Sequence, residues 1–141
     1  MTDFTLDPRL ANDCFVLGEL NSNLILLMNN SLLPWFILVP QTSEIEIIDL
    51  TASEQIKLQN SINVLGTFIK KYFTVSKLNI AAIGNIVNQL HIHIVGREPS
   101  DYCWPNVVWG TSERKSYTEL NVDKITIALK EQLGTKFQSY K

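Results

Sequence analysis

The segment Thr51–Tyr72 restricts the possible folds of this chain more than any other stretch. Thr51 followed by Glu54 forms a capping box, in which each side chain satisfies a backbone amide at the start of a helix. Apolar residues then recur at three- and four-residue steps, which predicts one long helix with a single apolar face; they are Ile62, Leu65, Phe68, Ile69 and Tyr72. We expect this face to cover a sheet, because strand-like segments lie on both sides of the helix in the sequence.

Five short segments have the patterns of strands, namely Phe15–Leu20, Asn23–Met28, Trp35–Val39, Leu78–Ile83 and Gln89–Val95. Asn21-Ser22 separates the first two and predicts a hairpin turn. The segment Ser43–Leu50 is compatible with a short helix or with irregular structure. Val122–Leu133 has the periodicity of a second helix, and Gly134 is a stop signal. Residues Gly96–Gly110 predict a loop that packs, because they include large aromatic side chains.

This order of segments indicates an α+β fold with a mainly antiparallel sheet of about five strands, one long helix and a C-terminal helix. The strands come in clusters with the long helix between them, whereas a parallel doubly wound sheet would need a helix between successive strands. The 141 residues are 45% hydrophobic and 18% charged, so we expect a single domain over residues 1–141 with a core of its own.

Charge and hydropathy exclude several classes of protein. Lys and Arg number 12 against 14 Asp and Glu, which argues against a nucleic-acid backbone as the main partner. No apolar run approaches the roughly 20 residues that span a bilayer, so we expect no membrane partner. The N-terminus does not resemble a signal peptide. Two cysteines, Cys14 and Cys103, are too few for a disulfide framework, and we expect a cytoplasmic protein.

The chain has 2 histidines, His91 and His93, separated by one residue. On a strand they would share one face with Gln89, and residues two positions apart would be separated by about 6.5 to 7 Å along the strand. The apolar residues between them would point to the other face and enter the core. Three interpretations follow from the residues alone. The histidines belong to a polar stripe, they bind a metal with help from Asp101 or Cys103, or they act as nucleophile and acid or base in catalysis.

The segment QLHIHIV at 89–95 resembles the histidine triad (HIT) motif, in which three histidines alternate with apolar residues on a strand. The order of segments is similar as well, including the apolar strand that ends at Val39-Pro40. The sequence WPNVVWG at 104–110 and Pro34-Trp35 resemble a bacterial branch described as diadenosine-polyphosphate-hydrolase-like. The resemblance implies a HIT-like fold with its core at about residues 14–97 and a C-terminal loop and helix at 98–141.

The resemblance also implies catalytic roles. His91 matches the nucleophile, which would attack the α-phosphate of a nucleotide conjugate and form a nucleotidyl-histidine intermediate that water then hydrolyses. His93 matches the third histidine, which would contact phosphate oxygens and help the leaving group depart. The first position of the triad departs from the family pattern, because Gln89 stands where the family has histidine. An amide can donate a hydrogen bond, but it cannot carry a proton.

Substrate contacts are expected from three further places. The turn Gly84-Asn85 before the histidine strand offers backbone N–H groups and an amide to phosphate. Gln89 offers a second amide. Where family members often place an acidic residue for the ribose hydroxyls, this chain has Asn29 and Asn30. Asparagine binds a ribose more weakly than a carboxylate does.

Several other side chains have expected positions in the core, at the nucleobase or at the rim of the site. Trp35 and Phe36 are expected in the core, and the nucleobase pocket is expected near Leu26 or Met28. Arg97 faces phosphate or ends its strand as a solvated charge, with the solvated charge favoured. Trp104 and Trp109 are expected as packing groups at a dimer contact or at the rim of the site.

Taken together, these patterns predict a nucleotide hydrolase or nucleotidyl transferase acting through His91. Its substrates would be dinucleoside polyphosphates, phosphoramidates or other nucleotidyl conjugates, without a cofactor or metal. The alternative is a nucleotide-binding or signalling module with weak or no catalysis, which Gln89 and the missing ribose carboxylate favour. The family resemblance also implies a homodimer that forms through the long helix and a strand.

Overall fold

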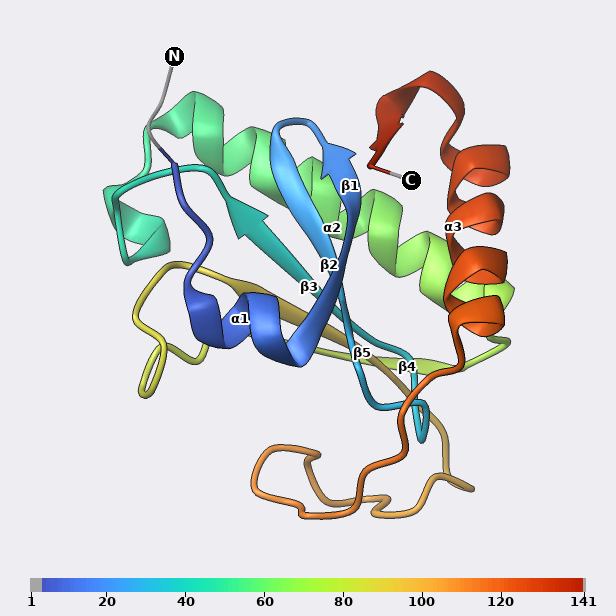
Figure 1. The fold of residues 1–141 in the computed structure, drawn as a ribbon. Coiled ribbons are helices and arrows are strands. Elements are labelled where there is room, and N and C mark those ends of the chain that lie inside the picture. The colour runs from blue at the N-terminus through green and yellow to red at the C-terminus, as the bar shows by residue number, and fades with distance from the viewer. Residues whose placement is uncertain (1–3, 141) are drawn as a thin grey trace.

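The fold was described from a computed structural model, which describes residues 4–140. In these residues a six-stranded sheet has the order β4-β5-β3-β2-β1-β6, and every neighbouring pair is antiparallel. The α+β prediction is therefore confirmed (Figure 1). The strands are β1 (Cys14–Leu20), β2 (Asn23–Met28), β3 (Trp35–Pro40), β4 (Lys77–Ala81), β5 (Ile92–Arg97) and β6 (Phe137–Ser139), and the helices are α1 (Pro8–Asp13), α2 (Ala52–Tyr72) and α3 (Glu119–Leu133).

The hairpin between β1 and β2 turns at the two residues that the sequence indicated. Asn21 and Ser22 have φ angles of 51° and 67°. Two successive positive φ angles twist the chain in the sense that antiparallel strands require, and asparagine tolerates this conformation well. The turn sets the register, in which Leu20 pairs with Asn23.

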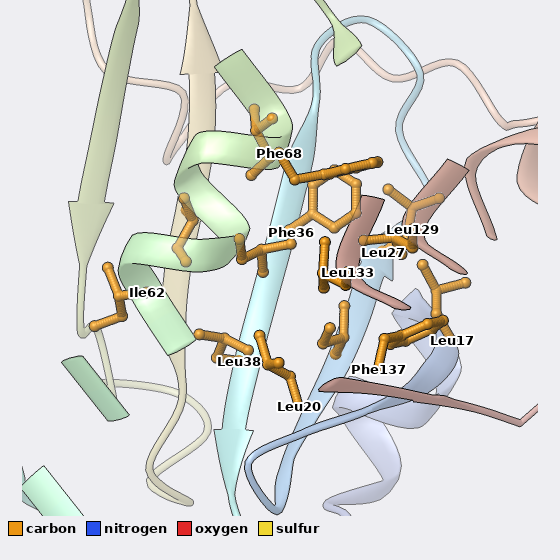
Figure 2. Close-up of a cluster of buried hydrophobic side chains, with 14 of the residues drawn as sticks. Leu17, Leu20, Leu27, Phe36, Leu38, Ile62, Phe68, Leu129, Leu133 and Phe137 are labelled. Carbon is orange, nitrogen blue, oxygen red and sulfur yellow. The ribbon is translucent and has the colours of Figure 1, made fainter. Parts of the chain in front are cut away.

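Helix α2 begins where the capping box predicted. The Thr51 hydroxyl accepts from the Glu54 backbone N–H at 3.1 Å, and the Glu54 carboxylate accepts from the Thr51 backbone N–H at 2.9 Å. Its apolar face packs on the sheet, where the rings of Phe36 and Phe68 meet edge to face at 6.2 Å. Figure 2 shows this core with side chains from α2, α3 and the strands, including Leu17, Leu20, Leu27, Leu38, Ile62, Leu129, Leu133 and Phe137.

The sheet has a second buried face on the side opposite α2. Helix α1 crosses this face in front of the strands (Figure 1). Its side chain Leu10 joins a cluster with alternate residues of β2 and β3 and with Val108 from the long loop before α3. The cluster also includes Leu24, Leu26, Met28, Trp35, Ile37, Val39 and Val95. Both faces of the central strands are therefore covered, which explains the uninterrupted apolar sequence of β3.

Several boundaries differ from the sequence prediction, including those of β4, which spans Lys77–Ala81 rather than Leu78–Ile83. Strand β5 spans Ile92–Arg97 rather than Gln89–Val95. Its last pair with β3 joins Leu38 and Ile92, and β3 ends two residues later at Pro40, which has no backbone N–H to donate. Helix α3 begins at Glu119, one turn earlier than predicted, because the Thr118 hydroxyl caps it.

Two elements were absent from the prediction. Helix α1 has six residues, too few to give a periodic pattern, and Asp7 caps it. Strand β6 has three residues and pairs with the outer edge of β1, where Gly18 lies opposite Ser139. A Cβ at Gly18 would collide with the carbonyl oxygen of Gln138, so glycine is what allows the sixth strand to approach.

Candidate active site

His91 and His93 lie on the face of the sheet opposite α2, as the alternation predicted. Ile92 and Ile94 enter the helix-side core between and after them. The histidine side chains are buried, with 4% of His91 and 6% of His93 exposed. Their ring centroids are 5.0 Å apart. Two imidazoles therefore occupy one small region at the start of β5.

The backbone fixes the tautomer of His91. Its Nδ1 lies 2.7 Å from the carbonyl oxygen of Gln89. A carbonyl oxygen only accepts hydrogen bonds, so Nδ1 is the nitrogen that carries the proton. In the neutral ring, Nε2 then has a free lone pair. His91 consequently has the form that a nucleophile or base requires.

Trp35 fixes the opposite tautomer in His93. The indole Nε1–H of Trp35 donates to Nδ1 of His93 at 2.9 Å, and this hydrogen bond is buried. Indole N–H is only a donor, so Nδ1 of His93 must be the accepting nitrogen and Nε2 carries the proton. The sequence interpretation placed Trp35 in the core, where it lies, but missed its hydrogen bond. The register between β3 and β5 indicates this hydrogen bond. Trp35 pairs with Val95, which lies two residues after His93, so the Trp35 and His93 side chains point to the same face of the sheet.

His93 is also enclosed by aromatic rings. The rings of Trp35 and Trp109 both lie edge to face with the His93 ring. The distance between ring centroids is 5.8 Å for Trp35 and 5.4 Å for Trp109. Burial, with a smaller contribution from the neighbouring His91, lowers the pKa of His93 from 6.5 to about 4. At neutral pH His93 is therefore an uncharged ring with one N–H, on Nε2.

A pocket of about 180 Å³ lies beside His91. It brings together four of the residues that the sequence singled out, Gly84, Asn85, Gln89 and His91. Gly84 and Asn85 are exposed in the loop between β4 and β5. Glu46 also lines the pocket and is exposed. The arrangement places the His91 side chain in the lining of a mainly polar cavity.

Comparison with known proteins identifies the family. A family model described as the HIT domain matches residues 9–100. The chain belongs to the histidine triad (HIT) family. A HIT protein from Sinorhizobium meliloti 1021 is 38% identical with a TM-score of 0.89, over 94% of this chain and 98% of that chain. A HIT protein from Bradyrhizobium japonicum is 35% identical with a TM-score of 0.87, over 92% and 97% respectively.

A third solved structure gives the same result. A HIT protein from Marinobacter aquaeolei VT8 is 38% identical with a TM-score of 0.87, over 92% of this chain and 96% of that chain. Among curated proteins, no match was found. Family and fold are thus both shown, and the family is one of nucleotide-related hydrolases and transferases.

In this HIT protein Gln89 has structural partners for both ends of its amide. Its Oε1 accepts from the Asp7 backbone N–H at 2.8 Å, and its Nε2 donates to the Thr5 carbonyl oxygen at 2.9 Å. The side chain therefore ties the segment before α1 to the histidine strand. Meanwhile its backbone carbonyl holds His91. A substrate contact by the Gln89 amide remains a prediction.

Asn29 and Asn30 do not line the pocket beside His91. They follow β2 at the opposite end of the sheet, where their amides hold the chain that leads to α3. The Asn29 side-chain oxygen accepts from the Tyr117 backbone N–H at 2.9 Å, and that of Asn30 accepts from the Lys115 backbone N–H at 3.3 Å. Ribose binding by these residues stays a prediction. Leu26 and Met28, expected near the base, are buried on the histidine face.

The expectation that Arg97 is a solvated charge is wrong. Its side chain is 1% exposed and forms an ion pair with Asp101 at 2.7 Å. It also donates to the Asn79 side chain and to the Asn106 carbonyl oxygen, each at 2.8 Å. Burial by itself would raise the pKa of Asp101, but the hydrogen bond from Arg97, the backbone hydrogen bonds from Glu98 and Cys103 and the charge of Arg97 together lower it. Arg97 thus anchors the loop after β5, and the Trp104 ring lies 5.7 Å from its guanidinium carbon.

A larger cavity of about 530 Å³ lies on the helix side of the sheet. Tyr72, Phe73, Tyr117 and Lys124 line it, together with residues of the loop after β5. Neither histidine contributes to it, so we assign the chemistry to the smaller pocket. Within residues 4–140 there is no cluster of three or more His, Cys, Asp or Glu side chains that could hold a metal ion. No helix in that range has the length and hydropathy to cross a membrane.

Proposed function

We propose that this HIT protein is a nucleotide hydrolase or nucleotidyl transferase in which His91 attacks the α-phosphate of a nucleotide conjugate. One observation carries the proposal, namely that the two histidines hold opposite tautomers. His91 presents a lone pair on Nε2 because Gln89 occupies its Nδ1, and His93 presents an N–H on Nε2 because Trp35 occupies its Nδ1. A nucleophile and a hydrogen-bond donor therefore stand side by side.

The reaction proceeds in two displacements. Nε2 of His91 forms a bond to phosphorus while the bond to the leaving group breaks, and the electron pair departs with that group. The Gln89 carbonyl stabilises the resulting positive ring through Nδ1–H. Water then forms a bond to phosphorus, gives a proton to solvent, and returns the electron pair to Nε2. In transfer, a hydroxyl or phosphate of an acceptor takes the place of water.

Negative charge on the phosphoryl group requires donors. His93 donates its Nε2–H to a phosphate oxygen, and the exposed loop at Gly84 and Asn85 offers backbone N–H groups and an amide. Asn29 and Asn30 are the proposed ribose contacts. The proposed substrates are dinucleoside polyphosphates, as in a diadenosine polyphosphate hydrolase, or phosphoramidates and other nucleotidyl conjugates, in the cytoplasm.

The test is to trap the covalent intermediate. Protein mixed with a dinucleoside polyphosphate and quenched in base should carry one nucleoside monophosphate on His91, located by peptide mass spectrometry. His91→Asn should abolish labelling. His93→Asn, the matched control at the other histidine, should slow labelling without moving it to another residue. Label on any residue other than His91 would contradict the mechanism.

A second function has a specific observation in its favour. Gln89 replaces a histidine, and amides stand at Asn29 and Asn30 where the family often has a carboxylate. A nucleotide-binding or signalling module with weak catalysis would use the same pocket. Calorimetric binding of the nucleotide without any His91 adduct would favour this alternative.

We also propose a homodimer, as the family resemblance implies. Strand β4 lies at the edge of the sheet, and Ile80 within it is 49% exposed. Pairing of two β4 edges would continue the sheet across a twofold axis. Sedimentation equilibrium should give twice the mass of one chain, and Ile80→Lys should return it to a monomer.

A further inference from the structure

Among residues 4–140, none of the side chains that line the pocket beside His91 can deliver a proton to a departing group at neutral pH. His93 is the first candidate to consider. To act as an acid at neutral pH it would have to be an imidazolium, with N–H on both nitrogens. Its Nδ1 instead faces the N–H of Trp35 at 2.9 Å, and a second proton there would set two donors against each other. Trp35 therefore keeps His93 neutral.

The surroundings of His93 support the same conclusion. The rings in contact with it belong to His91, Trp35 and Trp109, and of these only His91 has an ionisable side chain. A charge on His91 would oppose a charge on His93. No carboxylate accepts from the His93 ring in the part of the chain that the structure describes, so nothing there would stabilise an imidazolium. Burial moves the pKa of His93 down to about 4.

His93 lies beside His91 without lining the pocket, and the residues that do line it do not supply an acid either. Gln89 is an amide, which has no proton to give, and both ends of its side chain are engaged with the N-terminal segment. Asn85 and Asn88 are amides as well. Glu46 is an exposed carboxylate, and it is the one ionisable side chain besides His91 among the lining residues within the described range 4–140. An exposed carboxylate accepts hydrogen bonds at neutral pH.

From this we propose a narrower substrate range that rests on the function proposed above: the enzyme acts on those conjugates whose leaving group departs as a stable anion without receiving a proton. Phosphoanhydrides and mixed anhydrides of a carboxylic acid with a nucleotide meet this condition. In each the P–O bond breaks and the bridging oxygen leaves with the electron pair, as phosphate or carboxylate. A phosphoramidate does not, because its P–N bond would release an amide anion unless the nitrogen were protonated first.

The experiment is a leaving-group series on one nucleotide. Aryl esters of adenosine 5′-monophosphate with phenols of decreasing acidity would be mixed with excess enzyme at pH 7.5, and formation of the adenylyl-His91 adduct followed by rapid quench. The rate should fall about tenfold for each unit by which the phenol becomes less acidic. An adenosine phosphoramidate of an alkylamine should form adduct at least a hundredfold more slowly than a dinucleoside polyphosphate.

Failure of this inference is distinguishable from failure of the proposed function. If no ester labels His91, the proposed function is wrong. If every ester labels it with a shallow dependence on acidity, or the phosphoramidate reacts as fast as the polyphosphate, the function stands and the absence of an acid is refuted.

Trp35→Phe tests the role of the indole directly. The variant removes the N–H that faces Nδ1 of His93 while the ring stays buried. The leaving-group dependence should therefore become shallower at a higher pH than in the wild-type protein, with any difference between the two proteins larger at pH 5.5 than at pH 8. Nitrogen NMR of the wild-type protein gives an independent reading that requires no variant. Nδ1 of His93 should have an unprotonated resonance and Nε2 a protonated one at both pH values. A protonated Nδ1 in the wild-type protein would overturn the proposal.

Discussion

The burial of His93 should make the protein lose stability in mildly acidic solution. Its pKa is lowered from 6.5 to about 4 in the folded chain. As the pH falls through 6.5, the unfolded chain binds a proton at this residue before the folded chain does, so the free energy of unfolding decreases. The loss continues until about pH 4, where the folded state also protonates. Each pKa unit corresponds to about 1.4 kcal/mol, which gives a total loss of about 3 kcal/mol.

His93→Asn isolates this contribution. Asparagine can place its side-chain oxygen near the position of Nδ1 and still accept from Trp35, but it does not titrate. Urea unfolding of both proteins from pH 8 to pH 4 should give parallel curves above pH 7 and a difference that changes by about 3 kcal/mol between pH 6.5 and pH 4. The carboxylates with lowered pKa, Asp7 and Asp101, titrate below this window. Curves that stay parallel down to pH 4 would refute the reasoning.

Three further predictions concern other parts of the molecule. Asp101→Asn leaves the buried Arg97 without its ion partner and should cost about 3 kcal/mol in urea unfolding, whereas a loss below about 1 kcal/mol would mean that the pair is effectively solvated. Gly18→Ala should detach β6, because the new Cβ would collide with the Gln138 carbonyl oxygen. The rate of amide hydrogen exchange at residues 137–140 should then rise while that of α2 stays constant, and amides of β6 that remain protected would contradict this. Asn29→Asp keeps an acceptor for the Tyr117 backbone N–H and adds a negative charge that can accept from the ribose hydroxyls. Calorimetry should show several-fold tighter binding of adenosine monophosphate, with the free energy of unfolding unchanged. An unchanged affinity would remove Asn29 from the proposed site.

The elements that the sequence predicted best are those with local causes. The capping box at Thr51 and the positive-φ pair Asn21-Ser22 involve residues no more than a few positions apart, and both appear in the structure. Alternation in QLHIHIV was sufficient to place both histidines on one face, because side-chain direction along extended chain has a period of two. The boundaries of β5 required the partner strands and were therefore displaced.

The elements that were missed depend on distant contacts. Strand β6 exists because Gly18 leaves room for it at the edge of β1, and a three-residue segment has no pattern of its own. The sequence predicted an exposed charge for Arg97 at the end of its strand, because its partners are not its immediate neighbours in the sequence. Asp101 and Asn79 then surround it, from a loop and from the neighbouring strand. A charged residue becomes a buried anchor only when folding supplies its partners.

The sequence by itself determined the family resemblance, the layout of the long helix and strands, and the pair of imidazoles on one face. Only the tertiary structure decided which nitrogen of each imidazole carries the proton. For His91 the deciding group is the carbonyl of Gln89, two residues away, but for His93 it is the indole of Trp35, 58 positions earlier in the chain. A tautomer is set by the hydrogen bond that the other nitrogen makes, and for His93 that bond forms only when β3 and β5 lie side by side.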